Sequence, residues 1–141
     1  MTLKNTDNEY RIKVSNRQTI DSETDTIEET AYGNYTEKNG KQYITYKTEN
    51  DGDKISSMIK IDGNEILIKR TGSVNSSMTY KVDTKKEFLY HLPYGTVPME
   101  IETQRIVSKL DENGGTIELV YTLTVQDEKY FNDMKITVSK R

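Results

Sequence analysis

Apolar and polar residues alternate along most of the chain, with a period of two. Tyr10, Ile12 and Val14 open this pattern, each followed by a charged or hydroxyl residue. Such alternation is typical of a β-strand that buries one face and leaves the other in water. The longest series runs near the C-terminus through Ile117, Leu119, Tyr121, Leu123 and Val125. We expect Ile117, Leu119, Tyr121 and Leu123 to face the core, with Glu118, Thr122 and Thr124 outside.

Turn signals separate the alternating segments. Asn39-Gly40 and Asn113-Gly114-Gly115 predict tight hairpins, so Gly40 and Gly115 should have positive φ or adjoin a residue that does. The turn signals divide the chain into about ten short strands and leave no convincing long helix. This pattern predicts an antiparallel meander. A meander of about eight to ten strands avoids exposed edges best by closing on itself. The predicted fold is therefore all-β, a closed antiparallel up-and-down β-barrel forming one domain over residues 1–141.

Three places depart from simple alternation. Gly33 lies inside a strand pattern, which indicates a bulge or a sharp bend. The apolar parity changes near Gln104, which indicates a second bulge or twist. In segment 83–91, Thr84 and Glu87 match a helix capping box, whereas the later residues alternate. A strand is favoured there because Pro93 leaves too few residues for a stable helix, but the short helix stays open.

The segment from Leu92 to Thr103 holds both prolines of the chain. Pro93 and Pro98 lack an N–H and fix φ, so neither suits a central position of a sheet. Gly95 between them accepts positive φ. We expect a rigid loop that leads into a strand starting near Met99. The loop is either a plain connection or the lip of a pocket.

Composition narrows the range of partners. The net charge is -3 with 20 basic and 23 acidic residues interleaved, which gives no electrostatic footprint for nucleic acid. There is no cysteine, so disulfides and thiolate metal sites are excluded. No signal peptide and no apolar run of ~20 residues is visible, so we expect a cytoplasmic protein without a membrane span. For the oligomeric state, the sequence leaves both alternatives, a monomer and a homodimer.

Several motifs together resemble a known family. They are Tyr43-Ile44-Thr45-Tyr46 after the Asn39-Gly40 turn, the run Ile66 to Gly72, the run Tyr90 to Gly95, and the segments Met99–Thr103 and Gly114–Tyr121. In order and spacing they are similar to the uncharacterised YwiB-like family of small bacterial proteins, mostly from Gram-positive species. The resemblance implies a calycin-like β-barrel, the architecture of lipocalins and fatty-acid-binding proteins. It brings no established activity.

Arg70 is the leading candidate for a binding residue. It shares parity with Ile66 and Ile68, so it should point inward, at least half buried and hydrogen-bonded to protein or to an anion. Glu29 is a candidate partner. Arg70 could anchor a carboxylate or phosphate at the barrel mouth, or it could be a strand-end residue that reaches water. The remaining candidates for a ligand site could equally be core residues: Tyr46, Tyr90, Tyr94, Thr103 and Tyr121.

No catalytic chemistry is indicated. His91 is the only histidine, so a site with several histidine ligands is impossible within one chain. No nucleophile motif, phosphate-binding glycine loop or calcium loop is present, and we expect neither a metal nor a cofactor. The expected function is a non-enzymatic binder of a small amphipathic or apolar ligand. The alternative is a module with a solid core that interacts with other proteins or is structural.

Overall fold

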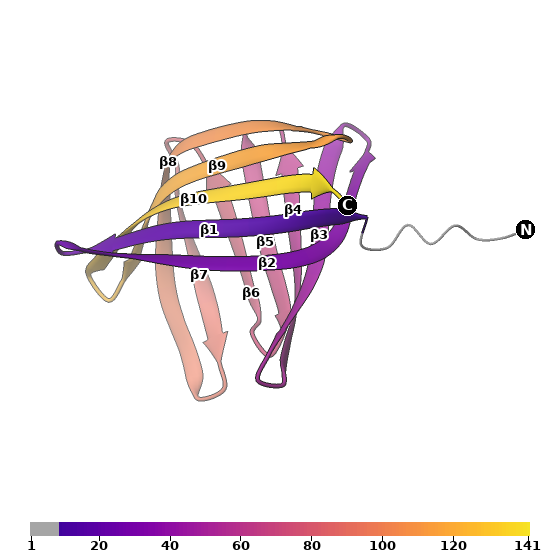
Figure 1. The fold of residues 1–141 in the computed structure, drawn as a ribbon. Coiled ribbons are helices and arrows are strands. Elements are labelled where there is room, and N and C mark those ends of the chain that lie inside the picture. The colour runs from indigo at the N-terminus through magenta and orange to yellow at the C-terminus, as the bar shows by residue number, and fades with distance from the viewer. Residues whose placement is uncertain (1–8) are drawn as a thin grey trace, which may run out of the picture.

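Residues 10–140 fold into β-strands joined by short turns (Figure 1). The computed structural model describes residues 9–141, except the side chain of Leu92. The predicted domain also included residues 1–8, which lie outside the described part. The strands are β1 (Tyr10–Ile20), β2 (Glu23–Lys38), β3 (Lys41–Asn50), β4 (Asp53–Asp62), β5 (Glu65–Gly72), β6 (Ser76–Lys81), β7 (Lys85–Leu92), β8 (Gly95–Asp111), β9 (Gly114–Val125) and β10 (Glu128–Lys140).

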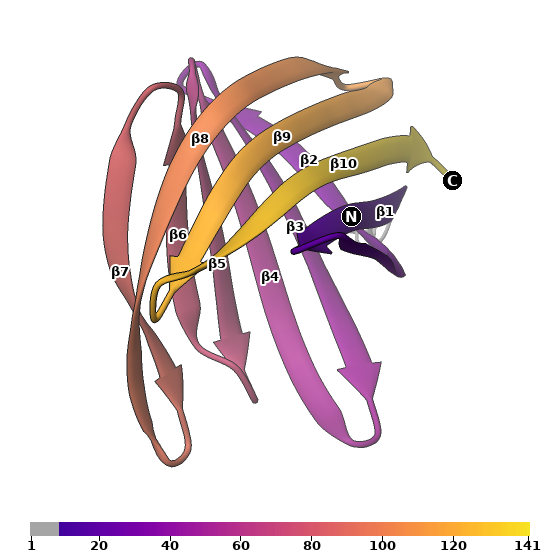
Figure 2. The same ribbon diagram turned by 90° about the vertical axis from the view of Figure 1, so that its left-hand side faces the viewer.

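The ten strands form one antiparallel sheet in the order β6-β5-β4-β3-β2-β1-β10-β9-β8-β7. The sheet curls until its two edge strands, β6 and β7, come together (Figures 1 and 2). Among residues 9–141, two isolated bridges join the sheet across this seam, one between Asn75 and His91 and one between Val82 and Thr103. The result is a nearly closed up-and-down barrel, which confirms the predicted fold class.

Within residues 9–141, the core consists of alternate residues from eight of the strands, and partly buried side chains of β2 and β7 pack against it. Ile12, Ile44, Ile66, Ile101 and Ile117 are completely shielded from solvent. Strand β9 places Ile117, Leu119 and Tyr121 inside, as its alternation predicts, with Leu123 partly buried. Thr122, predicted to lie outside, is instead only 7% exposed. It lies opposite Phe131 and accepts a hydrogen bond from Gln104, so neighbours cover it on the outer face.

Strand β2 bends at Gly33, as predicted. This residue lies opposite Tyr10 of β1 and also opposite Tyr46 of β3, so it belongs to both pairings. Before Gly33, strand β2 pairs with β1; after it, the strand pairs with β3. A Cβ at this position would collide with the Thr45 carbonyl oxygen and lie 2.7 Å from Cδ1 of Ile12. Only glycine fits a corner this tight.

The other predicted irregularities are also present. Gly40 has φ 77° and Gly115 has φ 146°, in agreement with the predicted hairpins. The register of β8 against β9 shifts between Thr103 and Arg105, which is the predicted bulge. Residues 85–92 form strand β7, so the helical alternative for this segment is wrong.

The expected loop between the two prolines is shorter than predicted. Pro93 and Tyr94 alone form a tight turn, and β8 begins at Gly95 rather than near Met99. Pro98 lies within β8, opposite Leu89, one residue before β8 starts to pair with β9. Its missing N–H therefore faces a side of β8 that has no partner strand yet, which is why the strand tolerates proline there.

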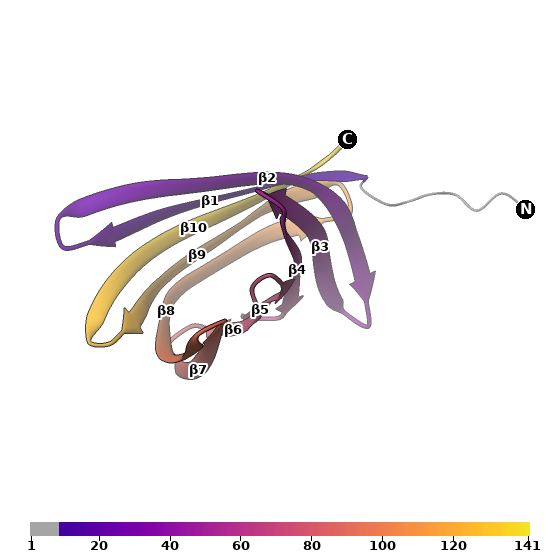
Figure 3. The same cartoon turned by 90° about the horizontal axis from the view of Figure 1, so that it is seen from below.

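The two ends of the barrel differ. At the end that contains the β2–β3, β4–β5 and β8–β9 turns, the Tyr10 hydroxyl donates to the Glu112 carbonyl over 2.7 Å. Gln42 Nε2 donates to the Tyr35 hydroxyl and to the Leu110 carbonyl. We call this the closed end. At the other end, five hairpins fan outward (Figure 3): β1–β2, β3–β4, β5–β6, β7–β8 and β9–β10. Ile27, at this end, is 60% exposed. We call it the open end.

Candidate functional site

Polar side chains form two rows on the inner wall of the barrel. On one half, Tyr46, Ser57, Arg70 and Ser76 lie directly opposite one another on neighbouring strands. On the other half, Gln18, Asn132, Tyr121 and Thr103 do the same. With Asn16 and Glu29 they form what we call the polar ring: Asn16, Gln18, Glu29, Tyr46, Ser57, Arg70, Ser76, Thr103, Tyr121 and Asn132.

Several members of the polar ring continue an apolar inward-facing series on their strands. Ser57 follows the parity of Ile59 and Ile61, and Arg70 follows that of Ile66 and Ile68, all of them buried isoleucines. Because side chains two residues apart share a face of the sheet, these polar residues must point inward. The ring therefore lies directly on the isoleucine core.

Tyr46 connects Glu29 with Arg70. The Tyr46 hydroxyl donates a hydrogen bond to Oε1 of Glu29 over 3.1 Å, and the same hydroxyl interacts with the Arg70 guanidinium. Burial alone would lower the pKa of Arg70, but the neighbouring Tyr46, Tyr80 and Glu29 hold that pKa above its usual value. Arg70 thus keeps its charge, although it is partly buried as predicted.

Two further tyrosines lie within the electrostatic reach of Arg70. The rings of Tyr80 and Tyr121 pack edge to face, with centroids 4.8 Å apart. Burial raises the pKa of Tyr121, and it raises the pKa of Tyr80 well above the usual value, while the charge of Arg70 acts in the opposite direction on both. Both hydroxyls therefore stay protonated, and that of Tyr80 donates to Sδ of Met78 over 3.3 Å.

Amide side chains form the opposite part of the ring. Asn132 Nδ2 donates to the Tyr130 carbonyl, and Oδ1 of Asn132 accepts hydrogen bonds from Asn16 Nδ2 and Gln18 Nε2, both over 3.0 Å. Two buried side-chain atoms in the described region have no hydrogen-bond partner, Oδ1 of Asn16 and Oγ1 of Thr103. Both of them belong to the polar ring.

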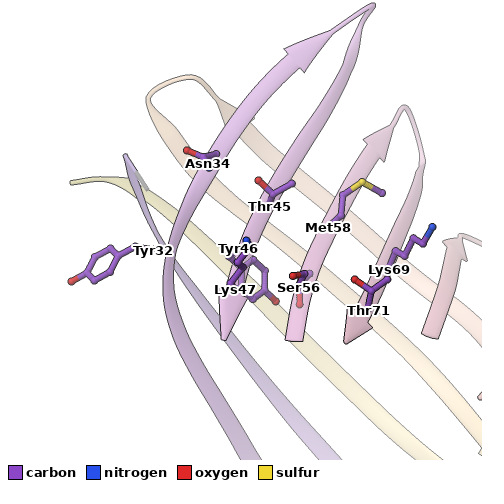
Figure 4. A pocket seen from close by; sticks show the side chains of 10 residues that line it. Tyr32, Asn34, Thr45, Tyr46, Lys47, Ser56, Met58, Lys69 and Thr71 are labelled. Carbon is purple, nitrogen blue, oxygen red and sulfur yellow. The ribbon is translucent and has the colours of Figure 1, made fainter. Parts of the chain in front are cut away.

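A first groove reaches the ring between β2 and the strands that follow it (Figure 4). Beyond the corner at Gly33, β3 has no partner residue on β2, so the two strands separate. The groove has a volume of about 690 Å³. Most of its lining belongs to the outer face, but Tyr46 and Ser57 of the ring also line it. The described lining residues are Tyr32, Asn34, Thr45, Tyr46, Lys47, Ser56, Ser57, Met58, Lys69 and Thr71.

A second groove, of about 420 Å³, lies at the seam between β6 and β7. Arg70 and Ser76 of the ring line it, together with the apolar side chains of Phe88 and Leu89. The other described lining residues are Lys69, Thr71, Asn75, Ser77 and His91, so this lining contains one lysine, one arginine and no carboxylate. The seam is open here because β6 and β7 share a single bridge at this end.

The structure brings five of the seven predicted site residues together: Glu29, Tyr46, Arg70, Thr103 and Tyr121. The other two lie apart. Tyr94 occupies the tip of the β7–β8 turn and is 85% exposed, because Pro93 and Tyr94 make a two-residue turn rather than a loop over the barrel. Tyr90 is half-buried on β7. Within residues 9–141, no hydrogen bond and no aromatic contact joins Tyr90 to the polar ring.

Comparison with known proteins places this barrel in a family. The family model described as "Domain of unknown function (DUF1934)" matches residues 12–138. The chain belongs to the DUF1934 family. It is 30% identical over 118 residues to the uncharacterised β-barrel protein YwiB of Bacillus subtilis, a match that covers 83% of each chain. The crystal structure of YwiB superposes with a TM-score of 0.87 at 26% identity, over 94% of this chain and 91% of that one.

In this DUF1934 protein, sequence reasoning missed half of the polar ring. Asn16, Gln18, Ser57, Ser76 and Asn132 were not predicted as site residues. The available signal was a polar residue at an inward position of an apolar series, as Ser57 is between Ile55 and Ile59.

Within residues 9–141, no three histidine, aspartate or glutamate side chains are grouped to hold a metal ion. Residues 9–141 contain no helix that is long and apolar enough to cross a membrane.

Proposed function

We propose that this DUF1934 protein binds a small amphipathic anion, a carboxylate or phosphate with an apolar part, at the open end of the barrel. Arg70 binds the anionic group, and Tyr46 helps to position the guanidinium. Phe88 and Leu89 in the seam groove contact the apolar part. The proposal is for a binding protein of the cytoplasm rather than an enzyme.

One observation carries this proposal, the incomplete set of partners around Arg70. A partly buried guanidinium is stable only when its five N–H donors find acceptors. Within residues 9–141, no carboxylate oxygen lies within ion-pair distance, 4.0 Å, of Arg70. Glu29 raises the pKa of Arg70 through its charge, and its Oε1 accepts a hydrogen bond from the Tyr46 hydroxyl. A ligand anion would supply the missing acceptors with bidentate geometry.

The surroundings of Arg70 also favour an anion with an apolar part. Lys69 precedes Arg70 and lines both grooves, which adds positive charge outside the ring. Leu89 is 55% exposed on the seam, and Phe88 packs against the core from the same strand. Apolar side chains beside a cationic centre suit a ligand with one charged and one apolar part.

The test compares dodecanoate with dodecanol, which has the same chain but no charge, by titration calorimetry. Arg70→Met keeps most of the stem and removes every donor. We expect it to weaken dodecanoate binding about tenfold or more, since hydrogen bonds to charged groups are the strong ones. Dodecanol binding and the denaturation midpoint should change far less.

Arg105→Met is the matched control. Arg105 lies on the outer face, 62% exposed, and its ion pair with Glu118 is 3.6 Å long. The same substitution there should leave dodecanoate binding unchanged. If neither dodecanoate nor the natural small molecules of the host cell bind, or if both arginine variants bind dodecanoate like the wild type, the proposal is wrong.

A solid-core interaction or structural module is the second candidate. The completely buried isoleucines favour it, because they fill the middle of the barrel from several strands. In that case Arg70 would serve stability alone. Arg70→Met would then lower the denaturation midpoint, and native mass spectrometry of the protein from its own host would show only the bare chain.

A further inference from the structure

One side of β2 has no partner strand over most of its length. Residues 23–32 pair with β1, and pairing with β3 begins only at Gly33. Figures 1 and 3 show the β1–β2 hairpin leading away from β3 beyond this corner. Within residues 9–141, no other strand pairs with this side of β2. A long sheet edge, which we call the free edge of β2, is therefore open to an added strand.

The register identifies the backbone groups on the free edge. A two-residue turn joins β1 to β2, so the flanking residues Ile20 and Glu23 exchange backbone hydrogen bonds. Hydrogen-bonded pairs recur at every second residue, so the odd-numbered residues of β2 bond to β1. The even-numbered residues point their N–H and C=O groups the other way, and before Gly33 these groups meet no strand. They belong to exposed residues: Thr24, Thr26, Glu28, Thr30 and Tyr32.

The inward face of the free edge is acidic and partly apolar. Ile27 and Asp25 point inward with Glu29, since residues two apart share a face of the sheet. Glu23 follows the same parity. Asp25 and Glu23 are exposed, and among residues 9–141 neither carboxylate has a cation within the 4.0 Å of an ion pair. Their neighbours on β1 are a glutamine and an isoleucine, which carry no charge.

The other carboxylates of this edge already have partners. Glu28, on the outer face, pairs with Lys13 of β1 over 3.4 Å. Glu29 accepts a hydrogen bond from the Tyr46 hydroxyl and interacts with the charge of Arg70. The unbalanced charge therefore lies at the half of the edge nearest the β1–β2 turn, beside an isoleucine that is 60% exposed.

We infer that the free edge of β2 binds an extended segment of a partner protein, in which an apolar residue is followed at alternate positions by two lysines or arginines. The segment adds as an antiparallel strand and bonds to the unpaired backbone groups. Its apolar side chain packs on Ile27, and its cations lie opposite Asp25 and Glu23. This partner is independent of the small anion proposed for Arg70.

A second copy of this chain fits the free edge less well. Antiparallel pairing of two copies around Ile27 would place Asp25 of each copy opposite Glu29 of the other. Like charges directly opposite each other destabilise a strand pair, and inward-pointing charges on an edge strand act against self-association. The same carboxylates attract a cationic strand, so the charge of the edge selects the partner.

The experiment uses the labelled peptide Thr-Thr-Thr-Val-Thr-Lys-Thr-Lys, capped at both ends, and measures fluorescence anisotropy at low ionic strength with the full chain. We expect saturable binding, with valine opposite Ile27. N-methylation of the threonine between valine and the first lysine removes a hydrogen bond to Thr26 and should weaken binding about tenfold. N-methylation of the first lysine, whose N–H points away from β2, is the matched control and should weaken binding less than about threefold.

Variants of the protein assign the contacts. Thr26→Pro removes an N–H that faces no strand and leaves the pairing with β1 intact, so it should abolish binding while the denaturation midpoint stays close to that of the wild type. Asp25→Asn combined with Glu23→Gln should weaken binding about fivefold and reduce its dependence on salt. Glu37→Gln is the control, since this exposed carboxylate lies on the part of β2 that pairs with β3, and it should leave binding unchanged.

Amide hydrogen exchange measured by NMR locates the bound peptide. Binding should slow exchange at the free-edge amides of β2 and leave the alternate amides, which already bond to β1, unchanged. A peptide that does not bind, or that binds without slowing exchange at these amides, would overturn the inference. So would equal affinity of the two methylated peptides. A dimer of the protein alone that Thr26→Pro dissociates would overturn it in favour of a second copy.

Discussion

Gly33→Ala tests whether the corner of β2 creates the open end. Gly33 is the one residue of β2 that lies opposite both β1 and β3, and the groove beside Tyr46 exists because the strands separate there. An alanine Cβ would collide with the Thr45 carbonyl oxygen and lie 2.8 Å from Cβ of Tyr46 and 2.7 Å from Cδ1 of Ile12. The substitution therefore places one methyl group against three neighbours at once.

The expected cost follows from what can move. The Thr45 oxygen is backbone and Tyr46 Cβ is fixed to backbone, so neither yields without distorting the sheet. The Ile12 methyl can rotate, but Ile12 is completely buried and has little space to do so. Inserting a methyl group into a packed interior costs about 1–3 kcal/mol, and rigid neighbours place this case at or above the upper limit. We expect a loss of about 3 kcal/mol or more, from a total typically of about 5–15 kcal/mol.

Urea denaturation followed by circular dichroism measures this loss. Gly63→Ala is the control for glycine replacement as such, since Gly63 has φ 62° and no atom within 4 Å of the added Cβ. Its cost comes from the left-handed backbone alone and should be roughly 1–2 kcal/mol. A Gly33→Ala protein that is as stable as wild type, or more stable than Gly63→Ala, would refute the close-packed corner.

Two further predictions concern the core. Leu119→Ala should cost about 2–5 kcal/mol, since Leu119 is completely buried and its loss leaves a cavity, whereas Glu118→Ala on the outer face should change stability by less than about 0.5 kcal/mol; equal denaturation midpoints would show that the strand faces are reversed. Burial raises the pKa of Tyr80 and Tyr121, so as pH rises past about 10 the unfolded chain loses its phenolic protons first and stability falls. Tyr80→Phe should flatten that alkaline decline, measured as the denaturation midpoint between about pH 9 and 11; an unchanged slope would contradict the burial of this hydroxyl.

The central loop shows where local chemistry misled the prediction. Two prolines and a glycine indicate restricted backbone, but they do not say whether the restricted residues form a loop or join a strand. Pairing with Leu89 keeps Pro98 inside β8, and this pairing depends on the register of β7. Tyr94 therefore lies at an exposed tip rather than over the barrel mouth.

The sequence by itself determined the strands, the turns and the side of the sheet on which each residue lies. These properties depend on neighbours one or two positions away, so alternation placed Arg70 and Tyr46 inside, and asparagine-glycine pairs located hairpins. Only the tertiary structure decided which inward polar residues meet. That Asn16 contacts Asn132, and that Glu29 binds Tyr46 rather than Arg70, follows from the order, register and curvature of strands far apart in the chain. A single strand contains no record of that curvature, because it arises only when all ten strands close around one core.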